Sequence, residues 1–160
     1  MFGKKKAAVV ERFMSRDPRT CGPGDSSNLA AQIMWDNDFG CVPVVDADGR
    51  AIGMITDRDI CMAAFTQGKP LAEIPVSSIF SHSVVTVHEH DTIEGAEAAM
   101  RRHRIRRVPV VDGKGRPVGV LSLSDLARHA GHRRGDLDVD AFVGTVAAIC
   151  EPPVHAAAAE

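Results

Sequence analysis

The sequence predicts an α/β (α+β) fold made of two copies of one small unit, each with the element order β-α-β-β-α. Residues 14–64 align without gaps on residues 80–130, and fifteen of these 51 positions are identical, whereas chance agreement between chains of ordinary composition is about 6%. Strand-like and helix-like apolar runs also follow one another in the same order in both copies. Since a unit of about 55 residues builds little core alone, we expect two units that share a buried face with approximate two-fold symmetry.

Apolar spacing and turn residues define the elements of the first copy. A helix over residues 7–14 ends before Pro18, because the residue before a proline avoids the helical region. A helix over 27–37 follows Asp25-Ser26-Ser27, whose side chains are of the type that caps helix N-termini. The other expected elements are a short strand over 19–21, strands over 42–46 and 51–56 joined at the Asp48-Gly49 turn, and a helix over 57–65.

The second copy repeats this pattern after a linker in which Pro75 suits the first turn of a short helix. Its expected elements are a strand over 84–87, a helix over 92–103, strands over 108–112 and 117–121, and a helix over 123–129. A polar break at 132–135 then precedes an amphipathic helix over 137–149, and the tail over 155–160 is expected to be disordered. The domain organisation follows as residues 7–68 for the first unit with its leading helix, 69–131 for the second unit with the linker helix, and 132–160 for the last helix and tail.

Composition and charge exclude several classes of protein. The formal net charge of −2 provides no field that would steer the chain to nucleic acid or an anionic membrane. No apolar run approaches the roughly 18 residues that span a bilayer, and residues 1–6 lack the apolar core of a signal peptide, so a cytoplasmic protein is expected. The four cysteines form no CxxC pair, which gives metal or redox chemistry little support and favours small buried hydrophobes.

The two strand-to-helix turns are the candidate site. They read Gly53-Met54-Ile55-Thr56-Asp57-Arg58-Asp59 and Gly119-Val120-Leu121-Ser122-Leu123-Ser124-Asp125. Such a turn presents free backbone N–H groups and the positive end of a helix dipole to an anion such as phosphate, and an aspartate can accept two ribose hydroxyl bonds. A hydroxyl residue with an acid three positions later is also close to a capping box, so capping alone is the alternative. Arg58 adds charge to the first turn, whereas Ser124 adds none to the second, which predicts weaker anion binding there.

The remaining distinctive residues give weaker signals. The run Arg101-Arg102-His103-Arg104-Ile105-Arg106-Arg107 is interpreted as a solvated helix end, with phosphate contact by Arg107 and Arg104 as the alternative. Nucleic-acid binding is disfavoured because no aromatic residue interleaves the run. His82, His88 and His90 lack a metal-ligand spacing and are expected at the surface, and Trp35 is expected to pack between units or protomers. No spacing of residues supports a catalytic triad or a carboxylate pair.

The chain resembles the CBS-domain pair, or Bateman module, of the bacterial type that stands alone in signal transduction. The residues that carry the resemblance are the runs from Val42-Pro43-Val44-Val45-Asp46 to Asp59 and from Val108-Pro109-Val110-Val111-Asp112 to Asp125. The likeness covers nearly all of residues 7–131. It implies a non-enzymatic, regulatory adenine-nucleotide sensor in which ligand binding reorients the two units, and which forms a homodimer through helical faces and signals to an unknown downstream protein.

The resemblance also implies the ligands and the residues that hold them. The candidate regulatory ligands are AMP, ADP, ATP, NAD(H) and S-adenosylmethionine, with no catalytic cofactor, no metal, no membrane and no nucleic acid. The implied nucleotide-binding residues are Thr20, Cys21, Cys41, Val42, Met54, Thr56, Arg58 and Asp59, and in the second unit Thr86, Val87, Arg107, Val108, Val120, Ser122 and Asp125. The alternatives are a structural or protein-interaction module with vestigial clefts and, less favoured, a nucleotide-processing enzyme.

Overall fold

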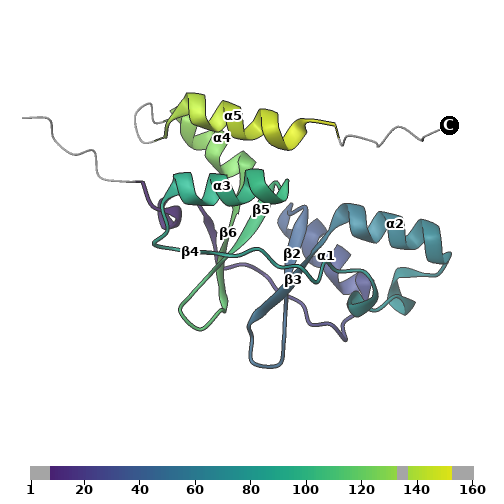
Figure 1. The fold of residues 1–160 in the computed structure, drawn as a ribbon. Coiled ribbons are helices and arrows are strands. Elements are labelled where there is room, and N and C mark those ends of the chain that lie inside the picture. The colour runs from purple at the N-terminus through teal and green to yellow at the C-terminus, as the bar shows by residue number, and fades with distance from the viewer. Residues whose placement is uncertain (1–7, 133–136, 153–160) are drawn as a thin grey trace, which may run out of the picture.

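The structure of the 160-residue chain is a computed structural model that describes residues 8–132 and 137–152 (Figure 1). It confirms the tandem α/β fold. The helices are α1 (Ser27–Asn37), α2 (Asp57–Gln67), α3 (Ile93–His103), α4 (Leu123–His132) and α5 (Val139–Cys150). The strands are β1 (Ser15–Arg16), β2 (Cys41–Val45), β3 (Ala51–Thr56), β4 (Val87–His88), β5 (Arg107–Val111) and β6 (Pro117–Ser122). The expectations for residues 1–6, for the polar break at 133–135 and for the tail over 155–160 lie outside the described residues.

The internal repeat is visible in the backbone. Both hairpins are antiparallel with equivalent registers, Cys41 opposite Thr56 in one and Arg107 opposite Ser122 in the other. In each hairpin the register shifts once, between the two last valines of the first strand. The two hairpins lie side by side (Figure 1), joined by a hydrogen bond of 2.9 Å from Ala51 N–H to the Gly115 carbonyl. The hairpins of the two units therefore repeat one structure.

Three expected elements are shorter than the sequence suggests. The leading helix over 7–14 is only a 3₁₀ turn at Val10–Arg12, because its N–H groups bond elsewhere: those of Val10 and Glu11 donate to the carbonyls of Asp91 and Glu89, both at 2.9 Å. The strand over 19–21 is reduced to one parallel bridge between Cys21 and Val44. The strand over 84–87 is reduced to β4, two residues that pair with the end of β5.

Two apolar cores lie under the helices, and each takes residues from the segment that leads into the other unit. The first core contains Ala30, Met34, Val42, Val44, Ile55 and Ile60 together with Val76 and Phe80 from the linker. The second core contains Val87, Ile93, Met100, Val108, Val110, Leu121 and Leu126 together with Val10, Phe13 and Met14 from the leading segment. Strand β1 continues this exchange, since it pairs with β6 at the edge of the four-stranded sheet β1-β6-β5-β4.

The exchanged segments explain the glycine at the head of each turn motif. A Cβ on Gly119 would lie 2.6 Å from Met14 Sδ and 2.8 Å from the Ser15 carbonyl oxygen. A Cβ on Gly53 would lie 2.1 Å from Phe80 Cδ2 and 2.4 Å from the Ser81 carbonyl oxygen. The crossing backbone passes too close to the strand for any side chain there, so this glycine allows the two segments to touch.

The helical faces of the two units differ in what covers them. Helix α5 lies over α3 and α4 (Figure 1), where Thr145 and Ile149 are buried and Arg101 Nη1 donates to Thr145 Oγ1 at 2.6 Å. The α1–α2 face has no such cover within the described residues, and Trp35 and Phe65 are 85% and 81% exposed on it. Trp35 therefore does not pack between the units of one chain, while its packing between protomers stays a prediction.

Beneath α5 the second unit buries an incompletely satisfied carboxyl group. Glu97 on α3 is 1% exposed, and its Oε1 has no hydrogen-bond partner. Burial raises the pKa of Glu97, against the opposing effects of the Arg101 charge and the Thr145 hydroxyl.

Of the helices in the described ranges, none combines the length and the apolar character needed to cross a bilayer.

Candidate functional site

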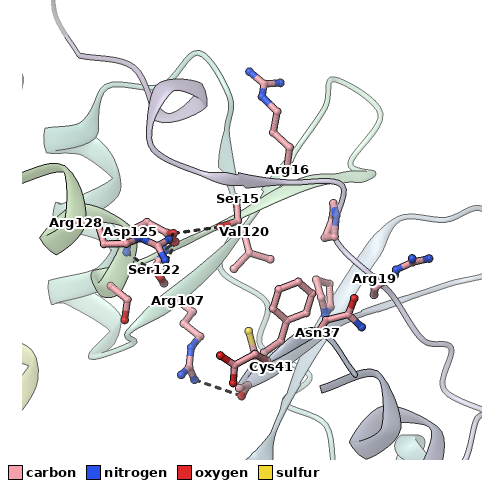
Figure 2. A pocket seen from close by; sticks show the side chains of 16 residues that line it. Ser15, Arg16, Arg19, Asn37, Cys41, Arg107, Val120, Ser122, Asp125 and Arg128 are labelled. Atoms are coloured by element: carbon pink, nitrogen blue, oxygen red, sulfur yellow. Dashed lines mark hydrogen bonds and ion pairs between the residues drawn. The ribbon is translucent and has the colours of Figure 1, made fainter. Parts of the chain in front are cut away.

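A cleft of about 350 Å³ lies between the two units on the side of the β6–α4 turn (Figure 2), within the usual size of small-molecule sites. Its walls come from the leading segment, from the end of α1 with β2, and from β5, β6 and α4. The lining residues are Ser15, Arg16, Pro18, Arg19, Asn37, Asp38, Phe39, Gly40, Cys41, Pro43, Arg107, Val120, Ser122, Ser124, Asp125 and Arg128. Five of them, Cys41, Arg107, Val120, Ser122 and Asp125, belong to the predicted set.

Asp125 is the centre of the polar network in this cleft. Its Oδ2 accepts hydrogen bonds from Ser122 N–H at 2.9 Å and from Ser122 Oγ at 2.5 Å, and Ser122 Oγ in turn accepts from Asp125 N–H at 3.2 Å. Its Oδ1 accepts from Ser15 Oγ at 3.1 Å and from Arg128 Nη2. Asp125 is only 4% exposed, and both of its carboxylate oxygens accept hydrogen bonds from neighbouring residues.

Arg107 connects the two units across the cleft. It begins β5 in the second unit, and its Nη1 donates to the Gly40 carbonyl of the first unit at 3.4 Å (Figure 2). Cys41 lies next to this contact, and burial raises the pKa of its thiol to about 11 although the Arg107 charge lowers it. The thiol is therefore neutral at physiological pH and forms a weakly polar wall rather than a nucleophile.

The turn of the first unit is built in the same way but lies outside this cleft. Thr56 and Asp59 form a complete capping box at the start of α2, with Asp59 Oδ2 accepting from Thr56 N–H at 2.8 Å and from Thr56 Oγ1 at 2.7 Å. Met54 and Arg58 flank it on β3 and α2. The hydrogen bonds of a capping box, which the sequence raised as the alternative, are therefore present at both turns.

Strand alternation separates the other predicted residues from the cleft. Val42 and Val108 are fully buried in the two cores, because neighbouring residues on a strand face opposite sides. Cys41 and Pro43 accordingly line the cleft, while Val42 between them does not. The positions in the preceding segments also fall outside the lining: Cys21 and Val87 are buried, and Thr20 and Thr86 are exposed.

Sequence reasoning missed the residues that reach the cleft through the exchange of segments. Ser15, Arg16, Pro18 and Arg19 come from the leading segment, whereas Asn37 ends α1 and residues 38–40 form the loop after it. Ser15 recurs as Ser81 in the repeat, a signal that pointed to a shared role. Arg128 carried a second signal, since it lies one helical turn after Asp125 and so faces the same way.

The cationic residues divide differently from the expectation. The sequence predicted little positive charge at the second turn, because Ser124 stands where the first turn has Arg58. In the structure, Arg107 and Arg128 line the cleft at this turn and supply that charge. Arg104 does not line the cleft and pairs with Glu151 at 3.3 Å. His82, His88 and His90 are exposed as expected, whereas the expectation of four buried cysteines is wrong for Cys61 and Cys150, which are exposed. Over the described ranges, His, Cys, Asp and Glu side chains nowhere gather in a group of three that suits a metal ion.

Comparison with known proteins agrees with this architecture. The family model of the CBS domain matches residues 10–65 and again residues 76–132. The CBS domain-containing protein YhcV of Bacillus subtilis is 36% identical over 118 residues, covering 74% of this chain and 82% of YhcV. Hypoxic response protein 1 of Mycobacterium tuberculosis is 34% identical over 134 residues, covering 83% of this chain and 88% of that protein.

A solved structure shows the same arrangement. The CBS domain pair of protein MJ0100, crystallised with 5′-methylthioadenosine and S-adenosyl-L-methionine, matches with a TM-score of 0.72 and 29% identity, covering 80% of this chain and 99% of that one. The chain therefore belongs to the CBS-domain family and carries a CBS-domain pair.

Proposed function

We propose that this CBS pair is a regulatory adenine-nucleotide sensor whose ligand occupies the cleft at the Ser122–Asp125 turn. The observation that carries the proposal is that one cleft joins a helix N-terminus, a carboxylate and an arginine that bridges both units. Helix N-termini favour phosphate, and the MJ0100 pair was crystallised with two adenosine derivatives. In this proposal the chain binds and releases its ligand without converting it.

The lining residues suggest how such a ligand would lie. Ser122 and Arg107 suit the phosphate, Asp125 suits the ribose hydroxyls, and Cys41, Pro43 and Val120 offer the weakly polar wall that an adenine ring needs. At the first turn, Thr56, Arg58 and Asp59 with Met54 would form a second, separate site. Thr20, Cys21, Val42, Thr86, Val87 and Val108 support these walls from behind or beside them rather than by lining the described cleft.

Signalling would follow from the Arg107 contact. A phosphate in the cleft competes with the Gly40 carbonyl for the Arg107 guanidinium, and charge-assisted bonds to an anion are the stronger kind. Losing this bond removes one of the contacts that fix the orientation of the two units, so a ligand that prefers the rearranged pair shifts the equilibrium by its differential affinity. A downstream protein would read the changed orientation.

The test is calorimetric titration of nucleotide-stripped protein with AMP, ADP, ATP, NAD, NADH and S-adenosylmethionine, beside Asp125→Ala and Asp59→Ala. Saturable binding that each variant reduces at one site supports the sensor. Folded protein that binds none of these ligands contradicts it and favours the alternative, an interaction module whose carboxylates serve only as helix caps.

We also propose that two copies of the chain associate through the α1–α2 face. The four exposed apolar residues on these helices are Leu29, Trp35, Met62 and Phe65. In the other repeat the equivalent α3–α4 face is covered by a helix of this same chain, α5, whose outer side still exposes Val139 and Val143. Light scattering should give a dimer that Trp35→Ala with Phe65→Ala converts to a monomer; an unchanged dimer would place the interface elsewhere.

A further inference from the structure

The two motif aspartates differ in a way that their shared sequence does not reveal. Over the described residues, hydrogen bonds to Asp59 reach only Oδ2, and Oδ1 accepts none. In Asp125 both oxygens are engaged, Oδ2 by Ser122 and Oδ1 by Ser15 and Arg128. The residue that corresponds to Arg128 in the first repeat is Met62, which has no charge to offer. The carboxylate at the described cleft is thus occupied before any ligand arrives.

The partners of Asp125 differ in how easily they can leave. The Arg128 side chain is 66% exposed while that of Asp125 is 5% exposed. Arg128 can therefore turn into the cleft it also lines while remaining in water, but the carboxylate cannot follow it. A ligand that takes the Oδ1 position leaves the guanidinium without its counter-ion, and a phosphate on the same ligand would replace that counter-ion.

We infer that Arg128 is exchanged between Asp125 and a ligand phosphate, so that this cleft accepts phosphorylated nucleosides and discriminates against uncharged nucleosides. The inference rests on the proposed nucleotide site and names its ligand class. The ribose hydroxyls take Oδ1 of Asp125, and the guanidinium moves to the phosphate at the start of α4. A neutral nucleoside also displaces Arg128 from the buried carboxylate, but it carries no anion that could pair with the displaced guanidinium.

The experiment compares AMP with adenosine by calorimetry in an Asp59→Ala background, so that the heat reports the cleft at Asp125. The chain with Arg128 should bind AMP with an affinity at least about tenfold higher than adenosine. Arg128→Met introduces the residue type found at the equivalent position of the first repeat. It should lower the affinity for AMP by about tenfold, since one charge-assisted bond is of this size, and leave the affinity for adenosine unchanged or higher. Arg102→Met removes the same charge from an exposed position on α3 and should preserve the AMP preference.

The outcomes separate this inference from the function it rests on. If neither AMP nor any other adenine nucleotide binds, the proposed function fails. The exchange is refuted, while the proposed sensor function stands, if nucleotides bind but Arg128→Met changes the affinities for AMP and adenosine by the same factor. The same conclusion follows if Arg102→Met also removes the preference for AMP over adenosine. Circular dichroism of Arg128→Met confirms that its helix and fold are intact, and Arg128→Gln provides a second variant with the same expected loss of AMP preference.

Discussion

Gly119→Ala tests the close contact between the leading segment and the second unit. The new Cβ would lie 2.6 Å from Met14 Sδ and 2.8 Å from the Ser15 carbonyl oxygen. The sulfur belongs to a flexible side chain and can move, but the carbonyl is backbone within β1, so the pairing of β1 with β6 must shift. Overpacking of this kind costs about 1–3 kcal/mol, offset by about 0.4–1 kcal/mol from the lower entropy of the unfolded chain.

We therefore expect the free energy of unfolding to fall by about 1–2 kcal/mol, measured by urea denaturation, with a Tm lower by roughly 2–8 °C. The matched control is Gly113→Ala, because a Cβ there meets nothing within 4 Å and should change stability by less than about 0.5 kcal/mol. Equal stability of the two variants would refute the argument from close approach.

Two further predictions concern titratable groups. Burial raises the pKa of Glu97 in the folded state, so its contribution to stability is greatest below its unfolded pKa and is lost as the pH rises through the folded pKa. Glu97→Gln should therefore stabilise the protein by on the order of 1 kcal/mol at pH 7 and give no gain at pH 4. Urea denaturation at both pH values measures this difference. A gain at both would contradict the titration. Ellman's reagent at pH 8 should label two thiols quickly and leave Cys21 and Cys41 slow, because both are buried with a pKa raised to about 11; four equally fast thiols would contradict their burial.

The sequence located the helices and hairpins well because their signals are local and occur twice. Caps such as Ser26 and Thr92, each accepting from the N–H three residues later, mark α1 and α3 to within a residue. The leading segment was mistaken for a helix because Val9, Val10 and Phe13 have helical spacing, while the hydrogen bonds of that segment go to residues near Asp91. Local pattern cannot identify partners that lie so far along the chain.

The site was predictable to the extent that the repeat defines it. Ser122 and Asp125 follow from the motif, and the resemblance placed Cys41 and Arg107 at the cleft. Ser15 and Arg128 are not predictable from the motif. Ser15 lies 110 residues before Asp125 in the chain, and the contribution of Arg128 depends on the direction of its side chain on α4. Val42 and Val108 do not line the described cleft, since strand alternation turns their side chains into the cores, and their role in binding stays a prediction.

The exchange of segments between the two units has a consequence for how the chain is made and how it can be divided. Ser15 and its partner Val120 on β6 are far apart in the chain, so the second sheet is completed by residues that are synthesised long before β6. If the gene were split in the linker, the first fragment would hold β1 without its sheet, and the second would hold Phe80 without its core. Each fragment alone exposes an open sheet edge of the kind that aggregates, whereas the two synthesised together would complement each other.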